Sequence, residues 1–353
     1  MPEPVPEPVP GCFILVARAR VDPELDLGAR QPRSHGVVDL VTQPPTRDRW
    51  RADAWPAIPL AAWRPTCETL HRFTQIVGKI RLALAPPRNH WWHVPLYVSA
   101  RGLTTSLVPY RGGGLQFDFD LVDHRLRIAT SVGALREIPL ESQSVARFHD
   151  GILAALRALD VRVDLWTTPV EVEDRTPFER DEHHCDYDAA AAARFWKAMV
   201  SSYAVFAEHQ SRFVGKASPI HFFWGAFDLA STRFSGRIAP QHPGAPNLAR
   251  SVAVEAYSHE VSSAGLWPGG GGYDDAAFYA YAYPEPRGYR DARVAPADAF
   301  YSDALREWIL PYEAVRRASS PERALREFLE TTYAAAAELG RWDRAALERA
   351  DPA

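Results

Sequence analysis

The sequence predicts an α+β fold made of two related halves. Apolar residues recur at helical spacing in residues 60–78 and again in 189–215. Each of these helices is followed by several short strand-like runs with no helix between them, which favours antiparallel sheets. Because a helix, several strands and a closing helix occur twice in this order, we expect an internal duplication. The two sheets are expected to pack together or join, with helices on the outside.

The first half is expected over residues 55–167. Its first helix ends on Gly78-Lys79, and its closing helix runs from Ser144 to Leu159. The strands between them are expected at 90–101, 115–121 and 126–130. Residues 168–187 are rich in proline and charge and form a linker to the second half.

The second half is expected over residues 188–347. Asp188 is a suitable N-cap for the helix that ends on Gly215-Lys216. The remaining elements are expected as strands at 221–224, 252–261 and 278–283 and a helix at 321–339. Before the strand at 278–283 lies a loop with four consecutive glycines, 269–272. This loop is either a mobile lid over a site or a plain hairpin loop.

The N-terminal segment, residues 1–54, differs from both halves. It begins with a Pro-Glu-Pro-Val repeat and has scattered proline and arginine with weak periodicity. Such a segment carries too little patterned apolar surface to offset the entropy cost of ordering. We expect it to be poorly ordered, or to be an extended translation start.

Composition excludes several classes of function. The 353 residues carry 40 Lys and Arg against 44 Asp and Glu, a net charge of −4, so no overall basic balance favours nucleic acid. The apolar runs are too short to cross a membrane, and the N-terminus lacks the charged region of a secretory signal. Three cysteines without paired spacing fit a reduced cytoplasm. We therefore expect a cytoplasmic protein whose partner is a small molecule, while cofactor and oligomeric state stay unspecified.

Lysine is rare in this chain and occurs only as Lys79, Lys197 and Lys216. Retention of lysine among so many arginines indicates positions that need a compact ammonium. Lys216 is therefore a candidate for binding a substrate. The Val-Gly-Lys tripeptide around Lys79 and Lys216 favours the alternative, a structural role shared by the two halves.

Arginines and a histidine near the ends of aromatic strands are candidates for anion binding. In the strand expected at 90–101, His93 and Arg101 share one polar face, which is either solvated or lines a cavity. Arg233 and Arg237 follow the aromatic run that begins at His221. An arginine from each half could bind a carboxylate bidentately.

The densest candidate cluster lies in residues 252–261. With a period of two, Glu255, Tyr257 and His259 share one face of the expected strand. This set suits acid/base catalysis, since a nearby carboxylate tunes an imidazole near neutral pH. Glu260 points the other way and could contribute only at a strand end or bulge. The alternative is a structural ladder of polar side chains paired with arginines.

The remaining candidate site residues are aromatic residues and residues of types that bind metals. Trp267 and Tyr281 could stack on an apolar part of a ligand, and the alternating tyrosines at 279–283 either pack on a helix or line an aromatic pocket. If a metal binds, His221, Glu255 and His259 are the expected ligands, although their spacing matches no zinc motif.

Several longer strings resemble the DUF5996 family, bacterial proteins of unknown function. The resemblance covers residues 55–347 and rests on specific runs of aromatic and ionisable residues. The clearest are Asn89-His90-Trp91-Trp92-His93, Arg101-Gly102-Leu103-Thr104-Thr105-Ser106, His221-Phe222-Phe223-Trp224-Gly225, Thr232-Arg233-Phe234-Ser235-Gly236-Arg237 and Glu255-Ala256-Tyr257-Ser258-His259-Glu260-Val261. The resemblance implies no activity, cofactor or catalytic residue.

These residues lead to three functional hypotheses. The first is an intracellular enzyme in which His259, tuned by Glu255, moves a proton on a small carboxylated molecule in a cleft between the halves. The second is a non-catalytic protein that binds or sequesters a small molecule in the same cleft. The third is a metal-dependent enzyme with His and Glu ligands.

Overall fold

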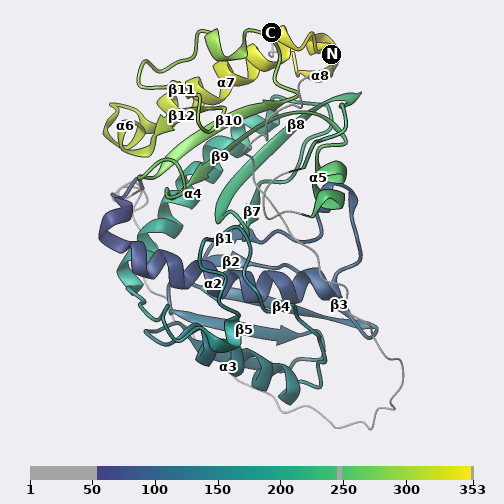
Figure 1. Cartoon of the computed structure of the whole chain (residues 1–353), viewed down its shortest axis with the longest axis vertical. Helices are drawn as coiled ribbons and strands as arrows, with labels where there is room; N and C mark the ends of the chain where they lie inside the picture. Colours follow the sequence, from purple (N-terminus) through teal and green to yellow (C-terminus); the bar gives the residue numbers. More distant parts are fainter. Residues whose placement is uncertain (1–53, 245–248, 351–353) are drawn as a thin grey trace, which may run out of the picture.

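The computed structural model describes residues 54–244 and 249–350, so the expectations for residues 1–53 lie outside the described part. Helices and two six-stranded antiparallel sheets confirm the α+β class (Figure 1). The first sheet spans residues 97–139 and the second spans residues 221–311. Within the described residues, no helix is both long and apolar enough to cross a membrane.

The first sheet has the strand order β1-β2-β4-β5-β6, with β3 paired to β4. Its strands are β1 (Tyr97–Ser99), β2 (Gly102–Thr104), β3 (Val108–Tyr110), β4 (Gly113–Asp120), β5 (Arg125–Thr130) and β6 (Leu135–Pro139). The strands expected at 115–121 and 126–130 are therefore confirmed as β4 and β5. They bury Phe117, Phe119, Leu126 and Ile128 on one face at a period of two.

The second sheet has the order β11-β12-β10-β9-β8-β7. Its strands are β7 (His221–Phe223), β8 (Asp228–Ile238), β9 (His259–Trp267), β10 (Ala277–Tyr283), β11 (Phe300–Ser302) and β12 (Glu307–Pro311). The two sheets are joined at their edges, because Leu96, just before β1, and Phe222 in β7 exchange both backbone hydrogen bonds at 2.9 and 2.8 Å.

Seven α-helices and three short 3₁₀ turns lie in the described residues. They are α2 (Leu60–Leu84), α3 (Val145–Ala158), α4 (Ala189–Ser211), α5 (Arg250–Ala256), α6 (Tyr312–Arg317), α7 (Pro321–Leu339), α8 (Arg344–Leu347), η1 (Asn89–Trp91), η2 (Phe178–Arg180) and η3 (Tyr289–Asp291). The expected caps form, since the Ser144 hydroxyl accepts from the Arg147 amide, and the Asp188 carboxylate accepts from two amides of α4. Helices α4 and α7 cover one face of the second sheet.

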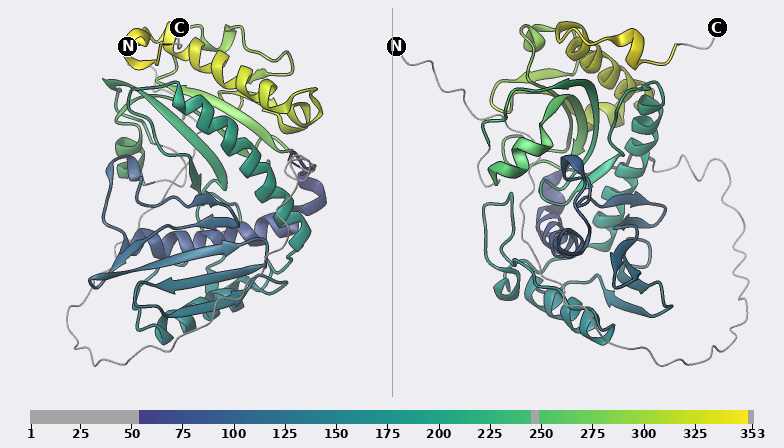
Figure 2. Two further views of the ribbon diagram at one scale, coloured as in Figure 1. Left: turned by 180° about the vertical axis from the view of Figure 1, so that it is seen from behind. Right: turned by 90° about the vertical axis from the view of Figure 1, so that its right-hand side faces the viewer.

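Helix α2 passes through the middle of the molecule, between the sheets, whereas α3 and α7 lie at opposite ends (Figure 2). Most of its residues are buried, including Phe73, Ile76 and Val77, which are fully inaccessible. Gly78 allows the closest approach, because a Cβ atom there would lie only 2.3 Å from the ring of Trp224. This contact fixes α2 against the chain that follows β7.

The two Val-Gly-Lys tripeptides have different structures. Helix α2 continues through Gly78 and Lys79 to Leu84, whereas α4 ends at Ser211, before Gly215 and Lys216. Lys79 is buried and donates to the carbonyl oxygens of Trp166 and Thr168 at 3.0 and 2.6 Å. The order helix, strands, helix does recur, but the duplication itself stays a prediction.

The strand expected at 90–101 is wrong over most of its length. Residues 89–91 form η1, in which both His90 and Trp91 have positive φ, and only Tyr97–Ser99 is a strand. A positive φ turns the chain out of the extended conformation, and Pro95 cannot donate to a sheet.

The strand expected at 252–261 is also wrong in its first part. Residues 250–256 form α5, with Val252 and Ala253 buried, and the strand begins only at His259. The Val-Ala-Val-Glu-Ala run alternates but also places its small apolar residues on one side of a short helix. Glu255, Tyr257 and His259 therefore do not share one face of a strand.

Glu307 in β12 makes the stability of the fold sensitive to pH. Burial, and then the charge of Asp228, raise the pKa of the Glu307 carboxyl well above its usual value. Because the pKa of Glu307 is higher in the folded than in the unfolded state, the group's full contribution to stability is present below the unfolded-state pKa of about 4.3. This contribution is lost as the pH rises through the folded-state pKa. Glu307→Gln is therefore expected to raise the free energy of unfolding at pH 8 by about 1–3 kcal/mol, and less at pH 5.

Urea unfolding of wild type and Glu307→Gln at pH 5 and pH 8 measures this difference. The exposed Glu141 gives a matched control, since Glu141→Gln is expected to change stability equally at both pH values. A Glu307→Gln effect independent of pH would contradict the assignment.

Candidate functional site

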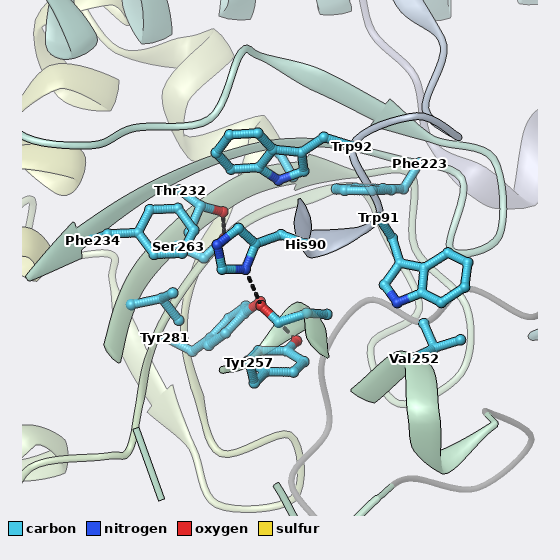
Figure 3. Close-up of a pocket in the computed structure, with 13 residues that line it drawn as sticks. His90, Trp91, Trp92, Phe223, Thr232, Phe234, Val252, Tyr257, Ser263 and Tyr281 are labelled. Carbon is cyan, nitrogen blue, oxygen red and sulfur yellow. Dashed lines mark hydrogen bonds between the residues drawn. The ribbon is translucent and has the colours of Figure 1, made fainter. Parts of the chain in front are cut away.

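A small pocket of about 60 Å³ lies where the first half meets the second sheet (Figure 3). The segment His90–Trp92 forms the wall from the first half, and α5, Tyr257 and strands β7, β8, β9 and β10 form the rest. Aromatic side chains from both halves line it: Trp91, Trp92, Phe223, Phe234, Tyr257 and Tyr281.

The backbone of the pocket wall is strained at two adjacent residues. His90 and Trp91 have φ angles of 55° and 63°, a region that costs non-glycine residues about 1–3 kcal/mol each. The following residues are held by side chains, because Trp224 Nε1 donates to Val94 O at 2.9 Å and Arg81 Nε donates to His93 O at 2.8 Å. Strain retained by such anchoring is typical of functional sites.

The imidazole of His90 is buried and bonded at both nitrogens. Nδ1 lies 3.1 Å from the carbonyl oxygen of Ala256, and Nε2 lies 2.6 Å from Lys216 Nζ. A carbonyl only accepts, so Nδ1 carries the proton and Nε2 accepts from the lysine. Burial lowers the pKa of His90, and the nearby charges of Lys216 and His259 lower it further. His90 is therefore neutral at pH 7.

Lys216 contacts the pocket residue His90 but does not itself line the pocket. Its Nζ is 5.3 Å from the ring centre of Trp92 and 4.9 Å from that of Phe234, within cation–π range. Partial burial of the ammonium lowers its pKa. Among the described residues, no carboxylate forms an ion pair with Lys216. The ammonium is thus held by an imidazole and two aromatic faces and has no anionic partner within that part of the chain.

Hydroxyl groups line the floor of the pocket in pairs. The Tyr257 and Tyr281 hydroxyl oxygens are 3.0 Å apart, and those of Thr232 and Ser263 are 2.9 Å apart. The row Tyr279, Tyr281, Tyr283 faces this side of β10, while the alanines between them face the main core. Of the three, Tyr281 lines the pocket, and Tyr279 and Tyr283 belong to the same apolar cluster.

His259 lies next to His90, and Glu255 is not bonded to His259 in the described structure. The His259 ring is edge-on to His90 with ring centres 5.6 Å apart, and its Nδ1 is 3.0 Å from Ser258 Oγ. Glu255 is exposed on α5 and makes no hydrogen bond or ion pair with His259 in the described structure. The expected carboxylate–imidazole pair is therefore wrong.

The three candidate arginines lie elsewhere and have structural partners. Arg101 pairs with Asp120 and Asp123 on the first sheet, at 2.7 and 2.8 Å. Arg233 points to the opposite face of β8 from the pocket, donates to the carbonyl of His209 and lies over the ring of Tyr333. Its burial lowers its pKa to about 10.

Arg237 and Glu260 form an ion pair with each other and do not line the pocket. Their ion pair, 2.6 Å long, also includes Ser235 Oγ, and Arg237 donates to backbone carbonyls before α8. This pair is the structural ladder that the sequence offered as the alternative.

The remaining candidates are divided between the core and a second cleft. His93 and His221 are buried, and burial lowers their pKa values to about 4 and about 3. Trp267 lies at the far end of β9 and lines a different cleft. No group of three or more metal-ligand side chains able to hold an ion occurs in the described structure, so His221, Glu255 and His259 do not form a common site there.

Sequence reasoning missed His90 and Trp92 as site residues. Both were placed on an ordinary strand, although they belong to the specific string 89–93. The density of aromatic and imidazole groups in that string was the available signal.

The fold and pocket define a two-sheet α+β protein with an aromatic pocket whose histidine, His90, is bonded to Lys216. The chain belongs to the DUF5996 family, described as a family of unknown function, whose match covers residues 55–349. No curated protein and no solved structure matches the chain.

Proposed function

We propose that this protein is an intracellular enzyme that uses the Lys216–His90 pair for acid/base chemistry on a small carboxylated molecule. The contact of 2.6 Å between Lys216 Nζ and His90 Nε2 carries the proposal. An ammonium without an anionic partner, next to an apolar pocket, is suited to bind a carboxylate. A lysine whose pKa is lowered by burial is also a better proton donor and acceptor near neutral pH.

The pair would move a proton in two stages. In the resting state Lys216 donates to His90 Nε2, while His90 Nδ1 is committed to the Ala256 carbonyl. A substrate carboxylate would bind the ammonium and leave the reacting carbon in the aromatic pocket. The ammonium would first pass one proton to His90 Nε2, and the free amine of Lys216 would then take a proton from that carbon. The same two transfers in reverse, with a proton from solvent, would return a proton to the carbon and restore the resting pair. A second imidazole, that of His259, lies beside the pair with its ring centre 5.6 Å from that of His90.

The pocket limits the size of the reacting group. Its volume of about 60 Å³ lies well below the range of about 300–1,000 Å³ of typical small-molecule sites. The substrate class that fits is a short oxo- or dicarboxylic acid.

Non-catalytic binding is the second candidate. The pocket hydroxyls already bond each other in the pairs Tyr257–Tyr281 and Thr232–Ser263. Hydroxyl groups paired in this way are as compatible with binding a ligand without reaction as they are with catalysis.

Proton exchange in D₂O distinguishes the two candidates. Pyruvate, malonate and acetoacetate are incubated with the protein, and loss of their C–H signals is followed by NMR, with thermal shift in parallel. Faster exchange of at least one acid supports the enzyme. Thermal stabilisation without exchange supports the binding protein, and the absence of both contradicts a carboxylate site. A denaturing extraction of the purified protein, analysed by mass spectrometry, searches for a retained ligand.

A further inference from the structure

A second and larger cleft, of about 490 Å³, lies between α2, the linker and the glycine-rich loop. Its volume falls in the range of small-molecule sites, about 300–1,000 Å³. Helix α2 contributes residues between 60 and 72, and the linker contributes 171–174 and 183–184. The chain after β7 contributes 226–227, and the loop contributes 267–271. The glycine-rich loop thus borders this cleft and not the Lys216 pocket.

A buried aspartate–histidine pair opens onto the cleft. Asp181, only 1% exposed, accepts from His184 Nδ1 at 2.8 Å and from the backbone amides of His183 and His184. Arg72 Nε lies 3.2 Å from the same carboxylate and balances its charge. The pair is therefore a built network and not a chance contact in a solvated linker.

This network leaves one nitrogen of His184 for a ligand. His184 is 8% exposed and lines the cleft. Its Nδ1 donates to Asp181, so Nε2 is the ring nitrogen that can bind a ligand. In the described part of the chain no hydrogen bond occupies Nε2.

The charge of the cleft indicates the sign of that ligand. Arg72 is balanced by Asp181, which leaves Arg64 as the remaining cation of the lining. Three carboxylates of the lining oppose it: Glu68, Glu173 and Asp174. Hydrogen bonds from Thr176 lower the pKa of Asp174 and keep it ionised. The cleft is thus net negative and attracts cations.

Aromatic rings provide the apolar wall. Trp267 lines the cleft at the end of β9, and Phe227 stacks on His71 with ring centres 4.8 Å apart. An aromatic face next to carboxylates is a favourable environment for an organic cation.

We propose that this cleft is a separate binding site for a small organic amine, whose ammonium is held by the carboxylates that line the cleft and by His184 Nε2. Its ligand is opposite in charge to the carboxylate proposed for Lys216, so the two sites do not compete.

Isothermal titration calorimetry on the full chain tests the proposal with benzylamine, putrescine and agmatine. Benzoate and succinate are controls of similar size and opposite charge. We expect at least one amine to bind and neither acid to bind in this cleft, as measured in a Lys216→Met background that removes the other anion site. Binding of the acids in that background, or no binding by any amine at millimolar concentration, would overturn the proposal.

Two sets of variants locate the binding. The double variant Glu68→Gln/Glu173→Gln is expected to weaken amine binding about tenfold, because it removes two partly screened charges. The control is Glu182→Gln. Glu182 is exposed in the linker but does not line the cleft, so this variant should leave amine binding unchanged. His184→Gln, which keeps an acceptor, is expected to bind better than His184→Leu. Equal affinities across the carboxamide variants would place the amine elsewhere and refute the site.

Discussion

Lys216→Met is expected to abolish both carboxylate binding and proton exchange. The substitution keeps the length of the side chain but removes the ammonium that bonds His90 at 2.6 Å. Because Lys216 is exposed and has no ion pair in the described structure, the free energy of unfolding should change by less than about 1 kcal/mol. Thermal shift with pyruvate and malonate, and proton exchange in D₂O, measure the two losses.

Two lysine variants serve as controls for this result. Lys197→Met, exposed on α4, should keep binding and exchange. Lys216→Arg should keep carboxylate binding but lose exchange, because a guanidinium does not give up its proton near neutral pH. If Lys216→Met behaves like Lys197→Met, the pocket is not the functional site.

Gly78→Ala is expected to destabilise the protein by about 1–3 kcal/mol. Alanine normally stabilises a helix relative to glycine by about 1 kcal/mol. Here its Cβ would lie 2.3–2.4 Å from the fully buried ring of Trp224, and such overpacking outweighs the helical gain. Displacement of Trp224 would also break its hydrogen bond to Val94 and release the strained segment at His90.

Gly151→Ala is the matched control for this prediction. Gly151 lies in α3, and the nearest atoms to its added Cβ, on Ile138, are 3.8 Å away. Denaturant unfolding should show a gain of up to about 1 kcal/mol for Gly151→Ala and a loss for Gly78→Ala. Equal gains for both variants would show that Trp224 does not pack as described.

Much of the fold follows from residue periodicity. The helix at 321–339 has its predicted bounds, because a proline at its start and a regular apolar stripe define it. The strands β5 and β10 also match closely, since β-branched and aromatic residues alternate there. Long, strongly periodic segments determine their own structure.

The secondary-structure predictions are wrong where tertiary contacts determine the local conformation. Residues 252–256 alternate as a strand would, but packing of Val252 and Ala253 makes them helical. The positive φ of His90 and Trp91 has no signature such as glycine, so a strand was expected. Lys216 and Tyr281 were identified as candidates, but their meeting at His90 depends on how the two halves join, which local patterns do not specify.

The central claim is that Lys216 is an ammonium poised against a neutral imidazole to receive a carboxylate. NMR of protein labelled at lysine tests it directly, because the chain has only Lys79, Lys197 and Lys216. The Lys216 signal should titrate below the ordinary lysine pKa of about 10.4, and its pKa should rise when pyruvate or malonate binds. Lys79, whose pKa burial lowers to about 7, should not respond to the acids. A Lys216 pKa at its ordinary value and unchanged by either acid would contradict the account.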